Sequence, residues 1–316
     1  MTGRVAPPSD EGIAEAVELL RAESVVAFPT ETVYGLGADA FSVKAVSEIY
    51  RLKNRPFWNP LIVHVATEAA ARDLSAFWPE NAEKMAAAFW PGPLTLVVRR
   101  AAHLTQVGAD NDTIALRIPA HDVALRLLSA SGLPLAAPSA NRSESISPTT
   151  AEHVLRSLPD VPLVLDGGPS SWGIESTVLD LTTDVPTLLR PGALGLRALR
   201  EVTGAIALRD AETADGAARP SPGMSRRHYA PRATLILTED VREVEVEGSV
   251  GVLTYEGTGV PGAEILSADP REYAADLYAA LHRLDDAGVA TILVQEPPRT
   301  EEWLAIRDRL GRAAAK

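Results

Sequence analysis

The segment 53–60 combines two cations with two prolines and reads Lys53-Asn54-Arg55-Pro56-Phe57-Trp58-Asn59-Pro60. Proline fixes φ and therefore stiffens the chain around the cations. Lysine and arginine side chains on a stiff loop can hold an anion such as a phosphate at a fixed position. The alternative is an exposed charged turn, because basic side chains are common on protein surfaces.

Two further polar segments follow predicted strands. Thr30 and Thr32 come after the apolar run 24–28, and Ser139 and Asn141 come after the run 134–137. Open α/β sheets bind ligands outside the carboxyl ends of their strands, so these side chains could line one site. Hydroxyls in turns also commonly cap the backbone, and that interpretation stays open for the threonines.

Two arginines occupy strand positions where charge is unusual. Arg117 lies inside the apolar strand predicted at 113–118, and Arg190 follows a second apolar run. A buried arginine is costly unless it is paired or faces a polar cavity, and its natural use is bidentate binding of a carboxylate. An edge strand that turns Arg117 toward solvent is the alternative.

Other candidates have equally plausible structural roles. His64, in the strand predicted at 61–65, could be a core histidine with a satisfied ring. The hydroxyl of Ser176 could bind a ligand or pair across a sheet. Thr149 or Thr150 could cap the helix that follows.

The elements that must position these residues alternate along the chain. Hydrophobic periodicity predicts helices and strands, with helices at 11–21, 42–52, 81–89, 121–130, 150–157, 196–202, 271–284 and 301–312, and strands at 24–28, 61–65, 94–98, 113–118, 134–137, 163–165, 176–181, 187–189, 233–237, 250–254 and 290–294. This alternation indicates an α/β fold. Connections near 177–189 are too short for helical crossovers, so we expect a mixed sheet. The segment 210–222, rich in Ala, Gly, Asp and Pro, reads as a linker to a second, smaller α/β unit.

The composition excludes several classes of protein. The net charge of −12 argues against a protein that coats nucleic acid. The chain has no cysteine, which excludes disulfides, zinc–thiolate sites and iron–sulfur clusters. No GxxxxGK[ST] loop is present, so side chains would have to hold any nucleotide. The polar N-terminus and the absence of an apolar run of about 18 residues predict a cytoplasmic protein without a membrane segment.

Together these segments resemble one family. The motifs PTETVYGLG, KNRP, NPLIVH, WPGPLTLV, ALRIP, APSAN, DGG, IESTV and LLRPG occur in this order. They are similar to the YrdC-like domain of threonylcarbamoyl-AMP synthases, over residues 13 to about 202. The segment 221–231, SPGMSRRHYAP, is similar to the linker of the long, two-domain form. The resemblance implies a YrdC-like mixed twisted sheet flanked by helices at 1–207, a linker at 208–231, and a Rossmann-like α/β domain at 232–316.

The resemblance also implies a reaction. Such an enzyme condenses L-threonine, bicarbonate or CO2, and ATP into threonylcarbamoyl-adenylate and releases pyrophosphate. Downstream proteins then transfer the threonylcarbamoyl group to tRNA. Mg2+ would lie among the phosphates, held largely by the nucleotide and water, with no metal-ligating residues expected from the chain. Neither membrane binding nor strong direct binding of nucleic acid is expected.

The same resemblance assigns roles to individual residues. Lys53, Arg55, Ser139 and Asn141 would hold the triphosphate and form the catalytic set. Further ATP contacts would come from Asn59, Thr113, Ser147, Arg190 and Tyr229, and threonine contacts from Thr32, His64, Arg117, Ala137 and Ser176. Tyr229 would fold over the nucleotide as part of a lid. Ser225-Arg226 stands where the family commonly has Lys-Tyr, so contacts of the lid at those two positions are not implied.

Two alternatives remain at this stage. Hydrogenase-maturation carbamoyltransferases also form a carbamoyl-adenylate on a YrdC-like domain, but they carry zinc-finger cysteines that this chain lacks. A non-catalytic RNA-binding protein is the other alternative, since the fold has a basic cleft. The net charge and the lack of basic stretches interleaved with aromatics argue against it.

Overall fold

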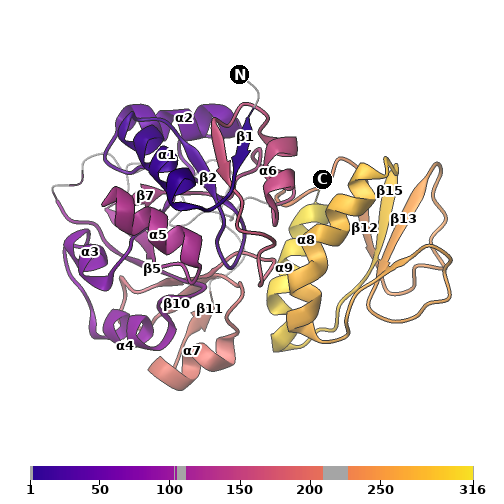
Figure 1. The fold of residues 1–316 in the computed structure, drawn as a ribbon. Coiled ribbons are helices and arrows are strands. Elements are labelled where there is room, and N and C mark those ends of the chain that lie inside the picture. Colours follow the sequence, from indigo (N-terminus) through magenta and orange to yellow (C-terminus); the bar gives the residue numbers. More distant parts are fainter. Residues whose placement is uncertain (1–2, 103, 105–111, 209–226, 316) are drawn as a thin grey trace.

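The computed structural model describes residues 3–102, 104, 112–208 and 227–315. They form two units (Figure 1), one around an 11-stranded sheet and one around a 4-stranded sheet. The linker predicted at 210–222 and the Ser225-Arg226 pair lie outside the described residues.

The first unit contains seven of the described helices, α1 Asp10–Arg21, α2 Val43–Lys53, α3 Glu68–Asp73, α4 Glu80–Phe89, α5 Asp122–Ser131, α6 Ala151–Ser157 and α7 Leu196–Thr203. Its strands are β1 Arg4–Ala6, β2 Val26–Phe28, β3 Gly35–Asp39, β4 Ile62–His64, β5 Leu94–Arg99, β6 Thr113–Arg117, β7 Leu135–Ala136, β8 Leu163–Leu165, β9 Thr177–Asp180, β10 Thr187–Arg190 and β11 Ala207–Leu208. The second unit contains β12 Thr234–Thr238, β13 Val250–Thr254, β14 Glu264–Ile265, α8 Pro270–Asp286, β15 Thr291–Gln295, the 3-10 helix η1 Glu301–Trp303 and α9 Leu304–Ala314.

The large sheet mixes parallel and antiparallel pairs, in the order β1-β8-β2-β3-β7-β4-β6-β5-β9-β10-β11. Strands β4 and β6 pair in parallel, whereas β9 and β10 pair antiparallel, as the short connection between them requires. The small sheet, β12-β15-β13-β14, is parallel throughout. The predicted mixed sheet with a smaller Rossmann-like α/β unit is therefore confirmed.

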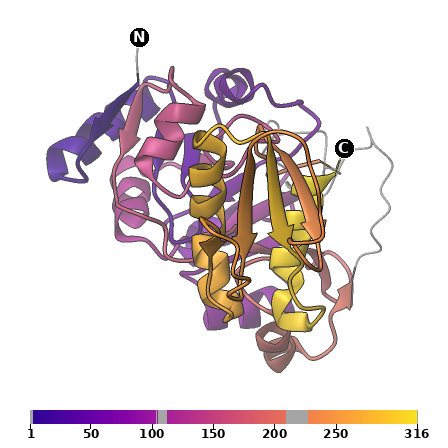
Figure 2. The ribbon, with the colours of Figure 1, turned by 90° about the vertical axis from the view of Figure 1, so that its right-hand side faces the viewer.

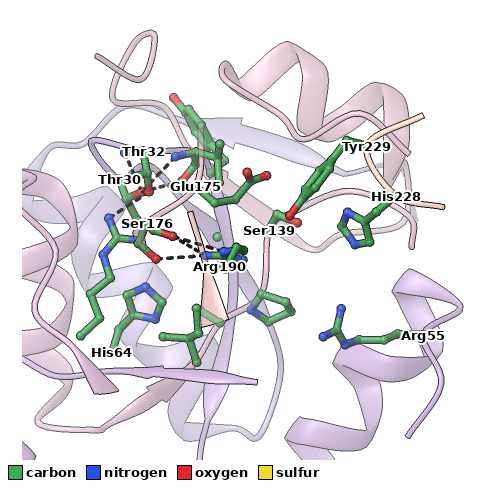
Figure 3. Close-up of a pocket in the computed structure, with 17 residues that line it drawn as sticks. Thr30, Thr32, Arg55, His64, Ser139, Glu175, Ser176, Arg190, His228 and Tyr229 are labelled. Atoms are coloured by element: carbon green, nitrogen blue, oxygen red, sulfur yellow. Dashed lines mark hydrogen bonds between the residues drawn. The ribbon is translucent and has the colours of Figure 1, made fainter. Parts of the chain in front are cut away.

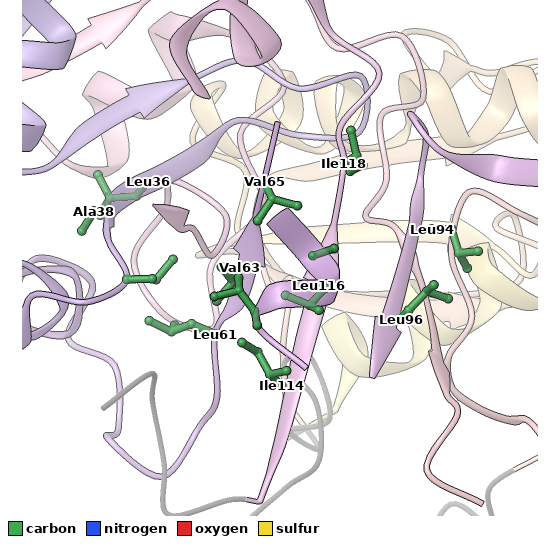
Figure 4. Packing of buried hydrophobic residues seen from close by; sticks show 14 of the residues in the cluster. Leu36, Ala38, Leu61, Val63, Val65, Leu94, Leu96, Ile114, Leu116 and Ile118 are labelled. Atoms are coloured by element: carbon green, nitrogen blue, oxygen red, sulfur yellow. The ribbon is translucent and has the colours of Figure 1, made fainter. Parts of the chain in front are cut away.

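The middle of the large sheet is the core of the first unit (Figure 4), where Val63, Leu96 and Leu116 pack with no exposed surface. Burying such side chains contributes about 1.5–3 kcal/mol each. Because β4 and β6 are covered, their polar residues lie inside the molecule as well. The parallel register places His64 of β4 opposite Arg117 of β6.

Polar side chains cap several of the described helices at their starts. Side chains of Ser42, Thr150 and Asp269 accept backbone N–H bonds at the starts of α2, α6 and α8, which satisfies donors that have no partner within the helix. Thr150 therefore has the capping role that the sequence left open. Helices α8 and α9 lie on the side of the small sheet that faces the first unit (Figures 1 and 2).

The structure departs from the predicted elements at two places. Lys53 ends α2 instead of opening the loop, because it continues the buried face of Ala45 and Ile49, and Asn54 then ends the helix in a left-handed conformation with φ 51°. The stretch 35–39 is a strand that the sequence pattern did not predict. Its Gly37 lets the ring of Phe28 pass close by, since a Cβ there would lie 2.6 Å from that ring. Short elements β1, α3, β11 and β14 also went unpredicted.

A membrane-crossing helix would need a longer apolar stretch than any helix in the described ranges provides.

Candidate functional site

A cavity opens among segments that are far apart in the sequence (Figure 3). It is lined by many of the predicted site residues, namely Thr32, Arg55, His64, Arg117, Ala137, Ser139, Ser176, Arg190 and Tyr229. Thr30 also lines it, as the strand-end pattern suggested, and so do Glu175 and His228, which the sequence-based prediction did not assign to the site. The cavity therefore brings together residues predicted for both the amino acid and the nucleotide.

Arg117 forms the polar centre of one side. Its strand lies between β4 and β5 and its side chain is buried, so the solvent-facing alternative is wrong. Nη2 of Arg117 donates to Thr32 Oγ1 at 2.9 Å and lies 2.8 Å from a carboxylate oxygen of Glu31. Thr32 in turn bonds Thr30, Oγ1 to Oγ1, at 2.8 Å, so the threonine hydroxyls both order the turn and orient the arginine.

His64 lies beside Arg117 and is buried. Burial, followed by the nearby Arg117 charge, lowers the pKa of His64 to about 3. The imidazole is therefore neutral at pH 7 and can both donate and accept a hydrogen bond. Its Nδ1 has no hydrogen-bond partner among the described residues, and His64 faces the cavity. These properties suit a small polar ligand better than a purely packing role.

Lys53 ties two parts of the site together. Its Nζ donates to the backbone carbonyl of Ser139 at 2.6 Å and to that of Asn141. The buried ammonium thus joins the end of α2 to the segment that follows β7. Burial, reinforced by Arg55, lowers the pKa of Lys53. The contact confirms that these predicted residues lie together, with Lys53 and Asn141 behind the cavity wall.

Arg55 lines the cavity itself. Its guanidinium donates to the carbonyls of Pro60 at 2.8 Å and Asn59 at 3.3 Å. Burial lowers the pKa of Arg55 to about 10, because its charge has no carboxylate partner among the described residues to offset desolvation. Lys53 and Arg55 therefore place two positive charges close together, and their hydrogen-bond partners in the described part of the chain are backbone carbonyls.

Arg190 and Ser176 form a third polar contact. Arg190 Nη2 donates to the Ser176 carbonyl at 2.8 Å and to its Oγ at 3.1 Å. The Ser176 hydroxyl also pairs with Thr95 across the sheet at 2.8 Å. Cross-sheet pairing, which the sequence left as an alternative, is thus present, and the same hydroxyl still lines the cavity.

Glu175 is the main residue that sequence reasoning missed. Its buried carboxylate accepts bonds from Ser147 Oγ at 2.6 Å, Tyr278 OH at 3.1 Å and Arg309 Nε at 2.7 Å. Burial opposes ionisation, but Arg309 and Arg190 outweigh it and hold the pKa of Glu175 at about 2. The signal was an acidic residue beside Ser176, where only the hydroxyls were considered.

The segment 227–231 covers the cavity from the side of the second unit. Tyr229 is buried with φ 61°, and its ring contacts that of His228 at a centroid distance of 4.0 Å. The Arg309 guanidinium lies 5.0 Å from the Tyr229 ring centre. The Ala230 amide donates to the Glu144 carbonyl at 2.8 Å and fastens the segment to the first unit. Burial raises the pKa of Tyr229.

Besides Lys53 and Asn141, three predicted residues do not line the cavity. Ser147 lies behind Glu175, to which it donates. The buried Asn59 uses its carbonyl to accept from Tyr50 and Arg55. Thr113 starts β6 at the opposite end from Arg117, paired with Arg99. Its role as an ATP contact remains a prediction.

The described residues contain no cluster of three or more His, Asp or Glu side chains that could hold a metal ion. Glu175, the carboxylate on the cavity wall, has its oxygens occupied by Ser147, Tyr278 and Arg309. The donor set that the described residues bring to the cavity therefore does not fit a protein-held metal.

Comparison with known families agrees with this geometry. A model of Sua5, YciO and YrdC proteins described as "Telomere recombination" matches residues 18–192. A model described as "Threonylcarbamoyl-AMP synthase, C-terminal domain" matches residues 195–315. The two matches together run through both units of the structure.

Individual relatives match over nearly their whole length. Threonylcarbamoyl-AMP synthase of Bacillus subtilis is 44% identical over 325 residues, covering 97% of this chain and 94% of the relative. The Pyrococcus abyssi synthase is 41% identical over 317 residues, covering 95% and 93%. The crystal structure of P. abyssi Sua5 complexed with L-threonine superimposes with a TM-score of 0.91 at 38% identity, covering 98% of this chain and 97% of that one. The chain therefore belongs to the Sua5-type threonylcarbamoyl-AMP synthase family, in the form that carries the C-terminal domain.

Proposed function

We propose that this chain synthesises L-threonylcarbamoyl-adenylate from L-threonine, bicarbonate or CO2, and ATP, and releases pyrophosphate. The product would supply the threonylcarbamoyl group for modification of tRNA by downstream proteins, which would place the activity in the cytoplasm. One observation carries the proposal. A single cavity joins Arg117, suited to a carboxylate, with Arg55 and the adjacent Lys53, which have no carboxylate partner among the described residues.

The amino acid would bind on the Arg117 side. Arg117 would take the threonine carboxylate in a charge-assisted contact, while Thr32, Ser176 and the neutral His64 would bond its polar groups. Ala137 would form the apolar wall. The P. abyssi structure with L-threonine supports this choice of ligand.

The nucleotide would bind on the side of Arg55, Ser139 and Arg190, with Lys53 and Asn141 fixing the segment behind them. After the amine of threonine has formed a carbamate, a carbamate oxygen attacks the α-phosphorus. The new P–O bond forms as the bond to the β-phosphate oxygen breaks, and pyrophosphate leaves with that electron pair. Catalysis of this kind needs positioning and stabilisation of charge, not a protein nucleophile.

Mg2+ would be bound by phosphate oxygens and water, because Glu175, the carboxylate among the described residues that line the cavity, is already bonded to Ser147, Tyr278 and Arg309. No step is assigned to it. Tyr229 and His228 would close the nucleotide side and exclude water from the carbamate and the adenylate. We further propose domain boundaries at 1–207, 208–231 and 232–316, with the middle segment as the lid. The family model boundary near residue 195 lies slightly before the first of these.

The test is a pyrophosphate-release assay with threonine or bicarbonate omitted and then restored. We expect release to require both substrates. Equal consumption of ATP without threonine would overturn the proposal. RNA binding that is tight and strongly salt-dependent, without ATP turnover, would instead support the non-catalytic alternative.

A further inference from the structure

Glu175 is a negative charge on the wall of a cavity that we propose to hold a triphosphate. Such a charge would repel the nucleotide if it were left uncompensated. The structure bonds it to Arg309, whose Nε lies 2.7 Å from Glu175 Oε2, and the charge of Arg190 also acts on it. Both side chains are buried, at 1% exposure for Arg309 and 8% for Glu175, so solvent screens neither.

This compensation comes from the other unit of the protein. Arg309 lies on α9 and Tyr278, which also donates to Glu175, lies on α8. Arg309 is fixed in turn, because its Nη1 donates to the Pro191 carbonyl and to Asp308, each at 2.8 Å. The pair is therefore an ordered contact between the units at the edge of the site, unlike an exposed surface bridge.

The contact also involves Ser147 and Tyr229, two residues that were predicted to bind ATP. Ser147 donates to Glu175 Oε1, and its carbonyl lies 3.2 Å from Nε2 of His282 on α8. Tyr229 lies between the Arg309 guanidinium, 5.0 Å from its ring centre, and Tyr278, whose ring centre is 5.9 Å away. Helices α8 and α9 thus touch the site at Glu175, Ser147 and Tyr229.

We propose that Arg309 is a positioning residue for adenylate formation. It neutralises Glu175 and holds that carboxylate against Ser147, so that the cavity wall presents no free negative charge to the triphosphate. The inference rests on the proposed function, and it gives the second unit a defined part in nucleotide binding. It involves the ATP side alone, since Arg117 is paired separately with Glu31.

Removing Arg309 should therefore act through the charge of Glu175. In R309M the carboxylate and the charge of Arg190 remain while the cation bonded to Glu175 is lost, and binding of an anionic ligand nearby should weaken. One unscreened charge at a distance of several ångströms is expected to weaken ATP binding about tenfold. Removing both charges in E175Q/R309M should restore binding, whereas a purely structural role predicts no recovery.

The experiment measures binding and turnover in the full-length protein. Isothermal titration calorimetry with an ATP analogue whose α–β bridge is a methylene group gives the Kd without chemistry. Steady-state pyrophosphate release gives KM for ATP and for threonine. For R309M we expect about a tenfold rise in Kd and in KM for ATP, with an unchanged KM for threonine. R309K, which keeps the charge, and E175Q/R309M should both bind the analogue nearly as wild type does.

Arg200 supplies a matched control. It pairs with Glu301 at 2.6 Å, also between the two units, but neither residue lines the cavity. R200M should leave both KM values unchanged. A wild-type Kd for R309M, or a Kd for E175Q/R309M as weak as that of R309M, would overturn the inference.

Two further outcomes are distinguishable. If R309M loses its cooperative thermal transition and therefore does not fold, R309K and E175Q/R309M test the charge-based role instead. Weakened ATP-analogue binding in both of these variants would contradict that role. Wild-type protein that releases no pyrophosphate in response to threonine would refute the proposed function, while the calorimetric comparison would still test the role of Arg309.

Discussion

Arg117 Nη2 lies 2.8 Å from a carboxylate oxygen of Glu31, and each side chain is 5% exposed. This buried pair stands at the proposed threonine side, where Arg117 also bonds Thr32. Removing one partner of a buried ion pair strongly destabilises the folded protein, because the remaining buried charge then has no compensation. Replacing Arg117 alone would therefore mix a loss of folding stability with a loss of substrate binding.

The first prediction separates these two effects. R117A should raise the KM for threonine by roughly 10–150-fold, which corresponds to a charge-assisted contact of about 1.5–3 kcal/mol. It should also lower the free energy of unfolding by about 3–5 kcal/mol, because Glu31 is left unpaired. Steady-state kinetics and denaturant unfolding measure the two quantities.

The control is R117A/E31Q, which removes both charges. We expect it to regain most of the lost stability while the KM for threonine stays high. A double variant that used threonine as well as wild type does would show that Arg117 only balances Glu31.

The second prediction concerns Lys53, whose Nζ holds the carbonyls of Ser139 and Asn141. K53M removes a charge beside the triphosphate and two charge-assisted bonds that fix the segment behind it. We expect kcat/KM for ATP to fall at least about tenfold. The matched control is K44M, since Lys44 is exposed and pairs only loosely with Glu23, at 3.4 Å. Equal kinetics for K53M and K44M would refute the role of Lys53.

The pH dependence of ATP use offers a check on the same residue. Burial, then the charge of Arg55, lowers the pKa of Lys53, so the cation is lost at a lower pH than for an exposed lysine. The charged form binds phosphate and exists below that pKa. KM for ATP should therefore rise as the pH is raised on the alkaline side, and K53M should lack this component.

The sequence predicted correctly those features that depend on a few neighbouring residues. An arginine inside an apolar strand predicted that Arg117 faces a polar cavity, and the structure bears this out because β6 lies inside the sheet. The strand ends that carry Thr32 and Ser139 also converge as expected. Periodicity and turn chemistry act over a few residues, and these features lie within that range.

The sequence did not predict features that depend on a contact between residues far apart in the chain. Glu175 and Arg309 are 134 positions apart, and nothing near Arg309 in the sequence distinguishes it from a partly exposed helical arginine such as Arg307. Only the packing of α9 against the first unit reveals the pair. Lys53 was misplaced by one residue for a different reason, since the left-handed Asn54 that ends α2 leaves little trace in the sequence.

The third prediction separates the ring of Tyr229 from its hydroxyl. The ring packs against His228 and beneath Arg309, whereas the hydroxyl has no hydrogen-bond partner among the described residues. If the ring closes the site, Y229F should keep KM for ATP near the wild-type value and Y229A should raise it several-fold, about 1 kcal/mol or more for a lost cation–π contact. Equal losses in Y229F and Y229A would instead assign the effect to the hydroxyl, as a direct contact with the nucleotide.

The fourth prediction concerns two stacked histidines between the units. The rings of His153 on α6 and His282 on α8 lie 3.8 Å apart at 21°. Burial lowers the pKa of His153 to about 3 and that of His282 to about 4. Both values lie below the pKa of about 6.5 that a histidine has in an unfolded chain. Between the folded-state pKa values and pH 6.5, the unfolded state therefore binds more protons than the folded state does. Stability from these groups is complete above pH 6.5 and is lost as the pH falls toward 4 and then 3.

The variant H153F/H282F removes both titrating groups and keeps two stacked rings. Between pH 7 and pH 5, the wild-type free energy of unfolding should fall with a slope approaching about 1.4 kcal/mol per pH unit for the buried His282. His153 should add less because it is partly exposed. The double variant should show a shallower slope even if it is less stable at pH 7, where it lacks the His282 contact with the Ser147 carbonyl. Glu175 does not interfere in this window, because its pKa of about 2 affects stability only below about 4.5. Parallel slopes for the two proteins, measured by denaturant unfolding, would show that the stacked pair does not couple contact between the units to pH.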